Sequence, residues 1–441
     1  CFDADPDPTL LKQLARCKRS LLMRCIPKPH YTKACIDPEI IDLYQRQKKE
    51  LASYREQKDY ILNNLLKALE EDPEYIRETL KNYSFAYAAT AQQSLGFEIR
   101  DAKEALGKDQ SPEYDTVIID EAARVNPGDL MIPLSQARRR IIMVGDHRQL
   151  PHMYDEEIFE ELNREGNNVH AEDIRESMFE HLLNRAKALT KKDGIVRFVT
   201  LDNQYRMHPD LGNFISRNFY ERYGEGFHSP LGPENFSQIL ENQPMKWIDI
   251  PLSSGKMESL SYSKFRSCEV ECIIDEIRRY KEKMGTLPLT IGVISFYRAQ
   301  VNQIRRRLKD ENLSDNVSVG TVDAFQGMEF DVIFLSIVRT GIDVNSINLD
   351  ELEKDPSSIE NQQEREKFVS RRDLVGRRQY GFLTSENRLC VALSRQKRLL
   401  VVVGDGTLFH GNPGGRMAQL FVPALKNFYE LCMDRGMVIR A

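Results

Sequence analysis

The chain has 441 residues, of which 41% are hydrophobic and 29% are charged, and its formal net charge is −5 at pH 7. This composition is typical of a globular protein with enough apolar material for large cores. The longest apolar runs are far too short to cross a bilayer and no signal or transit segment is recognisable, so no membrane partner is expected.

The N-terminal part begins at Cys1 rather than at a methionine, so we expect a fragment or a processed product. Cys17, Cys25, His30 and Cys35 lie close enough to raise the question of zinc, but they form no tight C-x2-C pair. Eight cysteines in a chain of this length do not indicate a disulfide framework. Reduced thiols are the favoured interpretation, and they indicate a cytoplasmic protein.

Residues 37–81 are expected to form an extended helical arm. Asp37, Pro38 and Glu39 supply an N-cap, a proline for the first turn and an acid near the positive end of the helix dipole. Apolar side chains then recur every three or four residues, the spacing of a helical hairpin or a short coiled-coil arm. A surface helix packed on a domain explains the same pattern equally well.

From Tyr83 onward, short apolar segments alternate with helical stretches, which predicts an α/β fold with parallel sheets. Several of these segments are continuously apolar, as strands covered on both faces must be. Residues 155–195 are expected to be helical and to connect two sheets. Residues 344–380 are expected to form a long surface insertion or a partly mobile loop. The expected strands are residues 85–88, 116–119, 141–144, 197–201, 291–295, 317–321, 332–337 and 399–403.

The strongest local signal is an apolar strand that ends in Asp120 and Glu121. At the carboxyl end of a parallel strand, such acids project into the crevice where ligands bind. Asp120 could hold hydrated Mg²⁺, and Glu121 could activate a water for attack on a γ-phosphate. Alone, the pattern is also that of a surface turn after a strand.

Four further segments also carry candidate site residues. Gln149, in the loop after the next strand, could reach an attacking water or a terminal phosphate oxygen. Tyr205 offers a flat face for a base, and Arg206 is a fixed cation able to meet a phosphate with two hydrogen bonds. Gly327 would let backbone amides approach a phosphate, and Arg395 is a second candidate arginine finger.

Taken together and in this order, these segments resemble superfamily 1B helicases of the up-frameshift-like group. Residues 295–301 also resemble the family's motif IV, and residues 89–92 its threonine-containing strand end that touches nucleic acid. The resemblance covers roughly residues 83–405. The family signatures DEAxQ, GDxxQLxP, QYRMHP, VDxFQGxE and NVALSRA correspond here to residues 120–123, 145–151, 204–209, 322–329 and 390–396.

The resemblance implies two RecA-like P-loop NTPase domains with parallel sheets. The first would be the remainder of a domain in residues 1–195, with the helical arm at about 37–81 inserted in it, and the second would be residues 196–441. The expected activity is that of an ATP-dependent helicase or translocase, with Mg²⁺ as cofactor and single-stranded RNA or DNA as partner. The family moves 5′ to 3′, so that polarity is expected here by resemblance only.

The resemblance also implies a role for each motif residue. On the first domain, Asp120 would bind Mg²⁺, Glu121 would be the general base, and Gln149 would sense the γ-phosphate. On the second, Tyr205 would stack on adenine, and Arg206 and Arg395 would stabilise transition-state charge. The remaining assignments are Gly327 and Glu329 at the γ-phosphate and ribose sides of the nucleotide, and Thr90 and Thr321 near the nucleic-acid backbone.

Three departures from the family pattern bear on these expectations. Arg124 stands where glutamine is common, and Gln396 where alanine is usual. The phosphate-binding signature G-x4-G-K-[ST] occurs nowhere in the 441 residues. We therefore expect that an upstream segment, or a fused or partner domain, supplies that loop, and that this chain alone hydrolyses ATP poorly or not at all. The alternative is a non-hydrolytic nucleic-acid-binding or scaffolding module derived from a helicase.

Overall fold

The computed structural model describes residues 86–96, 114–152, 177–236, 240–285, 287–342 and 348–441, together with residue 99 and scattered residues between 42 and 67. The chain divides into two compact units. The first comprises Cys1–Ala88 and Gly96–Ser111, and the second comprises Ala89–Leu95 and Pro112–Ala441. Almost all described residues belong to the second unit, which holds the elements that carry the motifs.

The second unit is built on a six-stranded sheet in which every strand pair is parallel. This confirms the α/β fold class. Two of the expected strands have the observed bounds, and two others lie within or overlap longer strands. In spatial order the strands are β10 (Val438–Arg440), β3 (Met245–Asp249), β9 (Gln396–Gly404), β8 (Phe330–Ser336), β6 (Ile291–Ser295) and β7 (Val317–Thr321).

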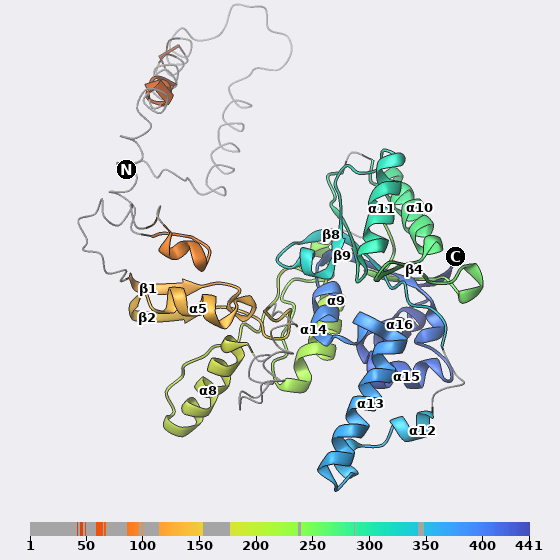
Figure 1. Ribbon diagram of the computed structural model, residues 1–441. Helices are drawn as coiled ribbons and strands as arrows, with labels where there is room; N and C mark the ends of the chain where they lie inside the picture. The colour runs from red at the N-terminus through yellow and green to blue at the C-terminus, as the bar shows by residue number, and fades with distance from the viewer. Residues whose placement is uncertain are drawn as a thin grey trace, which may run out of the picture. The chain divides into compact units, whose positions relative to one another are not determined.

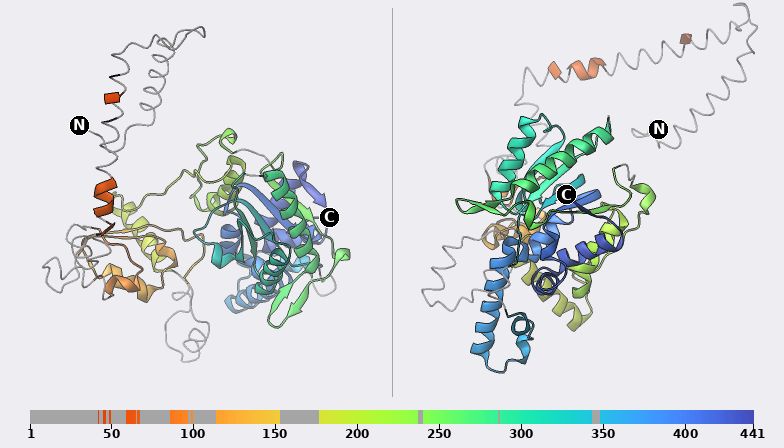
Figure 2. Two further views of the ribbon diagram at one scale, coloured as in Figure 1. Left: turned by 90° about the horizontal axis from the view of Figure 1, so that it is seen from above. Right: turned by 90° about the vertical axis from the view of Figure 1, so that its right-hand side faces the viewer.

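Helices cover this sheet on both faces, which is why its central strands are continuously apolar (Figures 1 and 2). Val332 and Phe334 of β8 pack under α10 (Ser267–Met284) and α11 (Arg298–Asp310). The alternate residues Ile333 and Leu335 belong to the core on the other face. That second face is covered by α9 (Pro209–Ile215), α14 (Glu386–Ala392), α15 (Gly414–Phe421) and α16 (Pro423–Asp434).

A second, smaller sheet pairs β1 (Tyr114–Ile119) with β2 (Ala137–Met143) in parallel. Its core is formed with η2 (Ala122–Arg124), α5 (Pro127–Leu134) and α8 (Met178–Asp193). These strands overlap the expected segments 116–119 and 141–144, but one side of the sheet is exposed. Ile118 is 66% exposed and Ile141 is 47% exposed, because no described element packs against that side.

Two expected strands are irregular in the structure. Residues 86–88 form no strand, and neither do residues 197–201. Val199 is 80% exposed, since this segment has no neighbouring strand among the described residues with which to pair. Arg197 is instead bound to Asp193 at the end of α8 by two hydrogen bonds of 2.7 Å, which hold the chain in a turn.

The segment expected to be a surface insertion or partly mobile loop contains regular helices. These are α12 (Leu349–Leu352), the short η9 (Pro356–Ser358) and α13 (Gln362–Tyr380) (Figure 1). Asn361 caps α13 by accepting from the backbone N–H groups of Gln363 and Glu364. The helix is polar on nearly all sides, so its sequence shows no apolar stripe. A loop interpretation was therefore wrong for these residues.

The expected helical arm falls mostly outside the described residues. The described residues between 42 and 67 are helical and exposed, while the choice between a coiled-coil arm and a packed surface helix is not settled by them. The group Cys17, Cys25, His30 and Cys35 lies outside the described residues. Among the helices that are described, none is long and apolar enough to cross a membrane.

Candidate nucleotide-binding site

Asp120 and Glu121 directly follow β1 at the end of the small sheet. Both residues are exposed, and the backbone N–H of Glu121 donates to Oδ1 of Asp120 at 2.9 Å. Glu121 has a left-handed backbone with φ 51° and ψ 36°. Residues other than glycine rarely adopt this conformation, and when they do they concentrate at functional sites. The turn therefore holds two adjacent carboxylates at the sheet edge.

The loop after β2 packs directly against this acidic turn. The N–H of Val144 donates to the carbonyl of Ile119 at 2.8 Å, and the N–H of Ala122 donates to the carbonyl of Val144 at 2.9 Å. A Cβ atom on Gly145 would lie only 3.0 Å from the backbone nitrogen of Ala123. Glycine at this position is what allows the two loops to approach so closely.

The side chain of Gln204 organises the segment that carries Tyr205 and Arg206. Its Oε1 accepts from the backbone N–H of Arg206 at 3.0 Å, and its Nε2 donates to Oγ of Ser229 at 2.7 Å. Tyr205 is left 63% exposed at the edge of the site. Arg206 donates from Nε to Oε1 of Glu329 at 2.7 Å. This cation is therefore paired with a carboxylate.

Glu329 lies between two cations of the large-sheet part. Partial burial favours its neutral form, but the hydrogen bonds and charges of Arg206 and Lys397 outweigh burial and lower its pKa. An ionised Glu329 holds the Arg206 guanidinium in place.

Arg395, which follows α14, is 2% exposed. Its Nε donates to the carbonyl of Val391 at 3.2 Å, and its Nη2 donates to Oγ of Ser394 at 2.9 Å. Burial lowers the pKa of Arg395, and the nearby charge of Arg206 acts in the same direction. Arginine nevertheless stays protonated in proteins, so Arg395 is a rigidly held, desolvated cation.

Two of the hydrogen bonds between the loops of the small sheet and the large-sheet part involve expected site residues. Nη2 of Arg395 donates to Oε1 of Gln149 at 3.1 Å. Nε2 of Gln326, from the loop after β7, donates to Oε2 of Glu121 at 3.3 Å. The glutamine and the buried arginine that the sequence singled out are thus in direct contact although they lie far apart in the chain.

A pocket of about 800 Å³ lies beside these contacts. Four of the residues expected from the sequence line it: Gln149, Tyr205, Arg206 and Glu329. Lys397 and Arg398 contribute further positive charge to its wall. A pocket of this size with an exposed aromatic ring and several cations suits a nucleotide, whose base can stack and whose phosphates need positive charge.

Several residues of this region were missed as functional candidates. Asp146 accepts from Nε2 of Gln149 at 2.8 Å and from the hydroxyl of Tyr220 at 2.6 Å. Burial, Cys390 and Asp146 together raise the pKa of Tyr220 well above its usual value, so its hydroxyl remains a donor. Asp146 and Gln326 stood inside the motifs and could have been chosen. Nothing in the sequence pointed to Tyr220.

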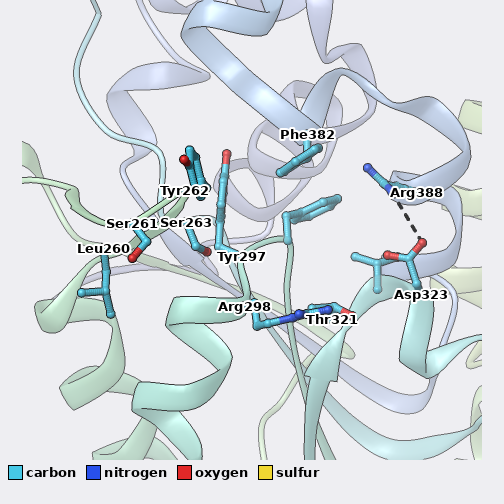
Figure 3. A pocket seen from close by; sticks show the side chains of 12 residues that line it. Leu260, Ser261, Tyr262, Ser263, Tyr297, Arg298, Thr321, Asp323, Phe382 and Arg388 are labelled. Atoms are coloured by element: carbon cyan, nitrogen blue, oxygen red, sulfur yellow. Dashed lines mark ion pairs between the residues drawn. The ribbon is translucent and has the colours of Figure 1, made fainter. Parts of the chain in front are cut away.

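Asp120, Glu121 and Arg395, described above, do not line this pocket, and neither do three further expected residues. Gly327 has a φ of 76°, and a Cβ there would meet nothing within 4 Å, so it leaves open space beside its backbone. Thr90 lies next to η1 (Gln92–Leu95), where its Oγ1 donates to Gln93 at 3.2 Å. Thr321 ends β7 and lines a second pocket of about 460 Å³ (Figure 3).

A metal ion would find few protein ligands in the part of the chain that is described. No group of three or more His, Cys, Asp or Glu side chains suited to a metal occurs there. Mg²⁺ is usually held by one or two carboxylates, with waters and substrate phosphates completing its shell. The exposed Asp120 carboxylate at the end of β1 fits that requirement, and Mg²⁺ there would neutralise phosphate charge.

Comparisons with known proteins agree with this geometry. A family model described as an AAA domain matches residues 174–407, and a second with the same description matches residues 43–156. Helicase sen1 of Schizosaccharomyces pombe is 27% identical over 303 residues, which are 67% of this chain and 15% of that protein. DNA polymerase alpha-associated DNA helicase A of Saccharomyces cerevisiae is 26% identical over 396 residues, which are 84% of this chain and 50% of the relative.

ATP-dependent helicase upf1 of Schizosaccharomyces pombe is 28% identical over 305 residues, which are 66% of this chain and 27% of the relative. The chain thus spans half or less of the length of these three relatives.

Proposed function

This chain belongs to the AAA-domain family of superfamily 1B, up-frameshift-like helicases, and we propose that it forms most of the motor of an ATP-dependent nucleic-acid helicase or translocase. The observation that carries the proposal is the hydrogen bond between Arg395 and Gln149 at 3.1 Å. It joins the loops of two parallel sheets beside a cationic pocket. Such a junction is what a motor needs if nucleotide turnover is to change the fit between two domains.

In this proposal the two sheets divide the chemistry between them. Asp120 holds Mg²⁺, which supplies charge neutralisation on the phosphates, and Glu121 accepts a proton from the attacking water. Gln149 orients the terminal phosphate. Arg206 and Arg395 stabilise the negative charge that develops in the transition state, because cations placed in a desolvated site act strongly there.

The remaining residues of the site bind the nucleotide. The exposed ring of Tyr205 stacks on adenine, Glu329 faces the ribose side, and Gly327 gives a phosphate room to approach the backbone. The Arg206–Glu329 ion pair of 2.7 Å has to open when Arg206 turns to a phosphate. Glu329 then keeps Lys397, 3.1 Å away, as its partner.

The phosphate-binding loop is the part that these 441 residues lack. We propose that a segment outside them, in the same protein or in a partner, supplies the G-x4-G-K-[ST] loop that cradles the β- and γ-phosphates. The same observation favours a second candidate function, in which the chain is a non-hydrolytic nucleic-acid-binding or scaffolding module.

Single-stranded RNA or DNA is the proposed substrate, with 5′-to-3′ movement taken from the family. Thr90 and Thr321 would contact its backbone. Binding of this kind depends on phosphate contacts and is therefore salt-dependent and tolerant of sequence. A cytoplasmic location is proposed from the cysteines alone, since Cys268, Cys272, Cys390 and Cys432 carry free thiols.

The deciding experiment measures ATP hydrolysis by the full-length protein with and without single strands. The motor proposal predicts strand-stimulated hydrolysis that Glu121→Gln abolishes while strand binding persists. Comparing poly-ribo with poly-deoxy strands in the same assay identifies the preferred substrate. Strand binding with no hydrolysis under any condition would favour the scaffolding module instead.

A further inference from the structure

A pocket separate from the nucleotide site opens on the large-sheet part of the chain (Figure 3). It holds about 460 Å³ and includes Thr321 at the end of β7. Its most exposed side chains are aromatic or apolar, although soluble proteins usually cover such groups. Tyr262 is 109% exposed and Phe382 is 48% exposed, so both rings are available to a ligand.

Tyr262 stands at the tip of a tight hairpin between β4 (Glu258–Leu260) and β5 (Ser263–Phe265). The turn has only two residues, Ser261 and Tyr262, and Ser261 has a φ of 53°. Two-residue hairpin turns normally place glycine or asparagine in that conformation. The hairpin thus accepts local backbone strain while presenting an uncovered aromatic ring in solvent.

Phe382 is held on the other side of the pocket by packing. Its ring lies 5.6 Å from the ring of Tyr297, measured between centroids, and Figure 3 shows Tyr297 between Phe382 and Tyr262. Gly381 precedes it with a φ of 58°, and a Cβ there would lie 2.0 Å from Arg339. Because Gly381 has no Cβ, the Arg339 side chain can lie close to its backbone. The Phe382 ring remains exposed.

Cations flank the aromatic rings. Arg388 lies over the Phe382 ring at 5.2 Å and is 3.6 Å from Asp323. Arg298, in the first turn of α11, is exposed and lines the same pocket. Proteins that bind single-stranded nucleic acids combine aromatic rings, on which the bases stack, with neighbouring cations, which bind the phosphates.

We propose that this pocket takes unpaired bases of the nucleic-acid strand, which stack against Tyr262 and Phe382, with a phosphate near Arg298. The inference rests on the proposed function, which supplies the strand. It adds that strand binding by the large-sheet part depends on contacts with the bases as well as on the charge of the strand's backbone. Thr321, at the pocket, is followed by η7 (Val322–Phe325) and then by Gln326, which donates to Glu121, so residues 321–326 connect the pocket with the carboxylate proposed as general base.

Fluorescence anisotropy with two labelled strands tests the inference. One strand is poly-deoxythymidine, and the other has the same length and backbone but abasic sugars. Tyr262→Ala and Phe382→Ala should each weaken binding of the base-containing strand by about 5- to 100-fold. Neither change should affect binding of the abasic strand, because the phosphate contacts remain.

Tyr262→Phe, which keeps the ring, should bind both strands as the wild type does. Leu374→Ala, at an apolar residue of α13 that is 68% exposed, serves as the matched control and should also bind normally. Since Tyr262 is fully exposed, its removal does not disturb folding. Wild-type affinity for the base-containing strand in both alanine variants would overturn the inference and leave the proposed function standing. Absence of strand binding by the wild type would remove both.

Discussion

Arg395 donates a hydrogen bond from Nη2 to Oε1 of Gln149 at 3.1 Å. The other end of the same amide donates to Asp146 at 2.8 Å, and Asp146 accepts in turn from Tyr220 at 2.6 Å. The orientation of Gln149 is thereby fixed from both sides, because its oxygen must face the arginine and its nitrogen the carboxylate. A change at either end is transmitted to the residue proposed to orient the terminal phosphate.

Arg395→Lys should lower the kcat of ATP hydrolysis by the full-length protein. Lysine keeps the charge but lacks the planar fork of five N–H donors with which Arg395 contacts Val391, Ser394 and Gln149. Loss of an arginine that stabilises transition-state charge lowers kcat by about 10³- to 10⁵-fold. Because lysine keeps the positive charge, we expect a smaller reduction for Arg395→Lys, of at least about 100-fold. Arg306→Ala, at a 79% exposed side chain of α11, should leave kcat unchanged. A lysine variant with wild-type kcat would remove Arg395 from the mechanism.

Glu121→Gln should abolish strand-stimulated ATP hydrolysis in the full-length protein, since an amide cannot accept the proton from water. The isolated 441-residue chain should show little or no hydrolysis even with Glu121 intact, because its sequence contains no G-x4-G-K-[ST] signature. Both statements are checked by measuring phosphate release with and without a single strand. Robust hydrolysis by the isolated chain that Glu121→Gln abolishes would contradict the second statement.

Gly212→Ala should displace the segment that carries Tyr205 and Arg206. The added Cβ would lie 2.5 Å from Oγ of Ser229 and 2.6 Å from Nε2 of Gln204, two atoms that are themselves hydrogen-bonded. Separating them releases the amide that holds the Arg206 backbone, and a displacement of about 1 Å costs on the order of 100-fold in kcat/KM. Steady-state kinetics on the full-length protein provides the measurement.

The control for that change is Gly415→Ala in α15. A Cβ at Gly415 meets nothing closer than 3.7 Å, and alanine favours a helix more than glycine does. This variant should keep wild-type kinetics and should be slightly more stable. Equal kcat/KM values in the two variants would show that crowding at Gly212 does not reach the site.

The sequence predicted well the strands that are buried on both faces. The segments at β6, β8 and β9 are largely apolar and are covered on both faces, so their composition alone revealed them. Strand β3 was missed because it contains Lys246, which is 2% exposed. Its ammonium group pairs with Glu241 at 3.1 Å and Glu276 at 2.8 Å. The local sequence around Lys246 does not predict these ion pairs.

For the candidate site as well, the sequence predicted local features but not the contacts between residues that are far apart in the chain. Motif spacing placed Glu121 at the carboxyl end of a strand, where ligands of parallel sheets bind, and Arg395 just before another strand. It could not reveal that Gln326 reaches Glu121 across 205 positions, nor that Arg206 is paired with Glu329. The first contact depends on how the two sheets face each other, and the second on packing within the large-sheet part. Both are set by packing distributed over many residues.

Glu241→Gln should reduce stability at neutral pH and have less effect in acid. Burial favours the neutral carboxyl, but Arg279, Tyr280 and Lys246 outweigh it and lower the pKa of Glu241 from 4.5 to about 2. A carboxyl group whose pKa is lowered by folding stabilises the fold at pH values above its pKa in the unfolded chain. For Glu241 this stabilisation is lost as the pH falls from 4.5 toward 2. The contribution at pH 7 is on the order of 3 kcal/mol.

Urea unfolding at pH 7 and at pH 3, followed through the fluorescence of the buried Trp247, measures this effect. The difference between wild type and Glu241→Gln in free energy of unfolding should shrink as the pH falls. Glu282→Gln, at an exposed position of α10, is the matched control and should show no such trend. A difference that stays constant with pH would mean that ionisation of Glu241 does not stabilise the fold.

Arg298→Ala should weaken single-strand binding by the chain in a way that depends on salt. Arg298 is exposed beside the pocket that contains Thr321, and each lost phosphate contact makes the slope of log affinity against log salt shallower by about 0.7 for a single strand. Tyr262→Ala, by contrast, should lower affinity without changing the slope, because stacking releases no counterions. Arg306→Ala, a basic residue on the same helix paired with Asp310, should leave both affinity and slope unchanged. Titrations at several salt concentrations separate these outcomes, and an unchanged slope for Arg298→Ala would place the phosphate contact elsewhere.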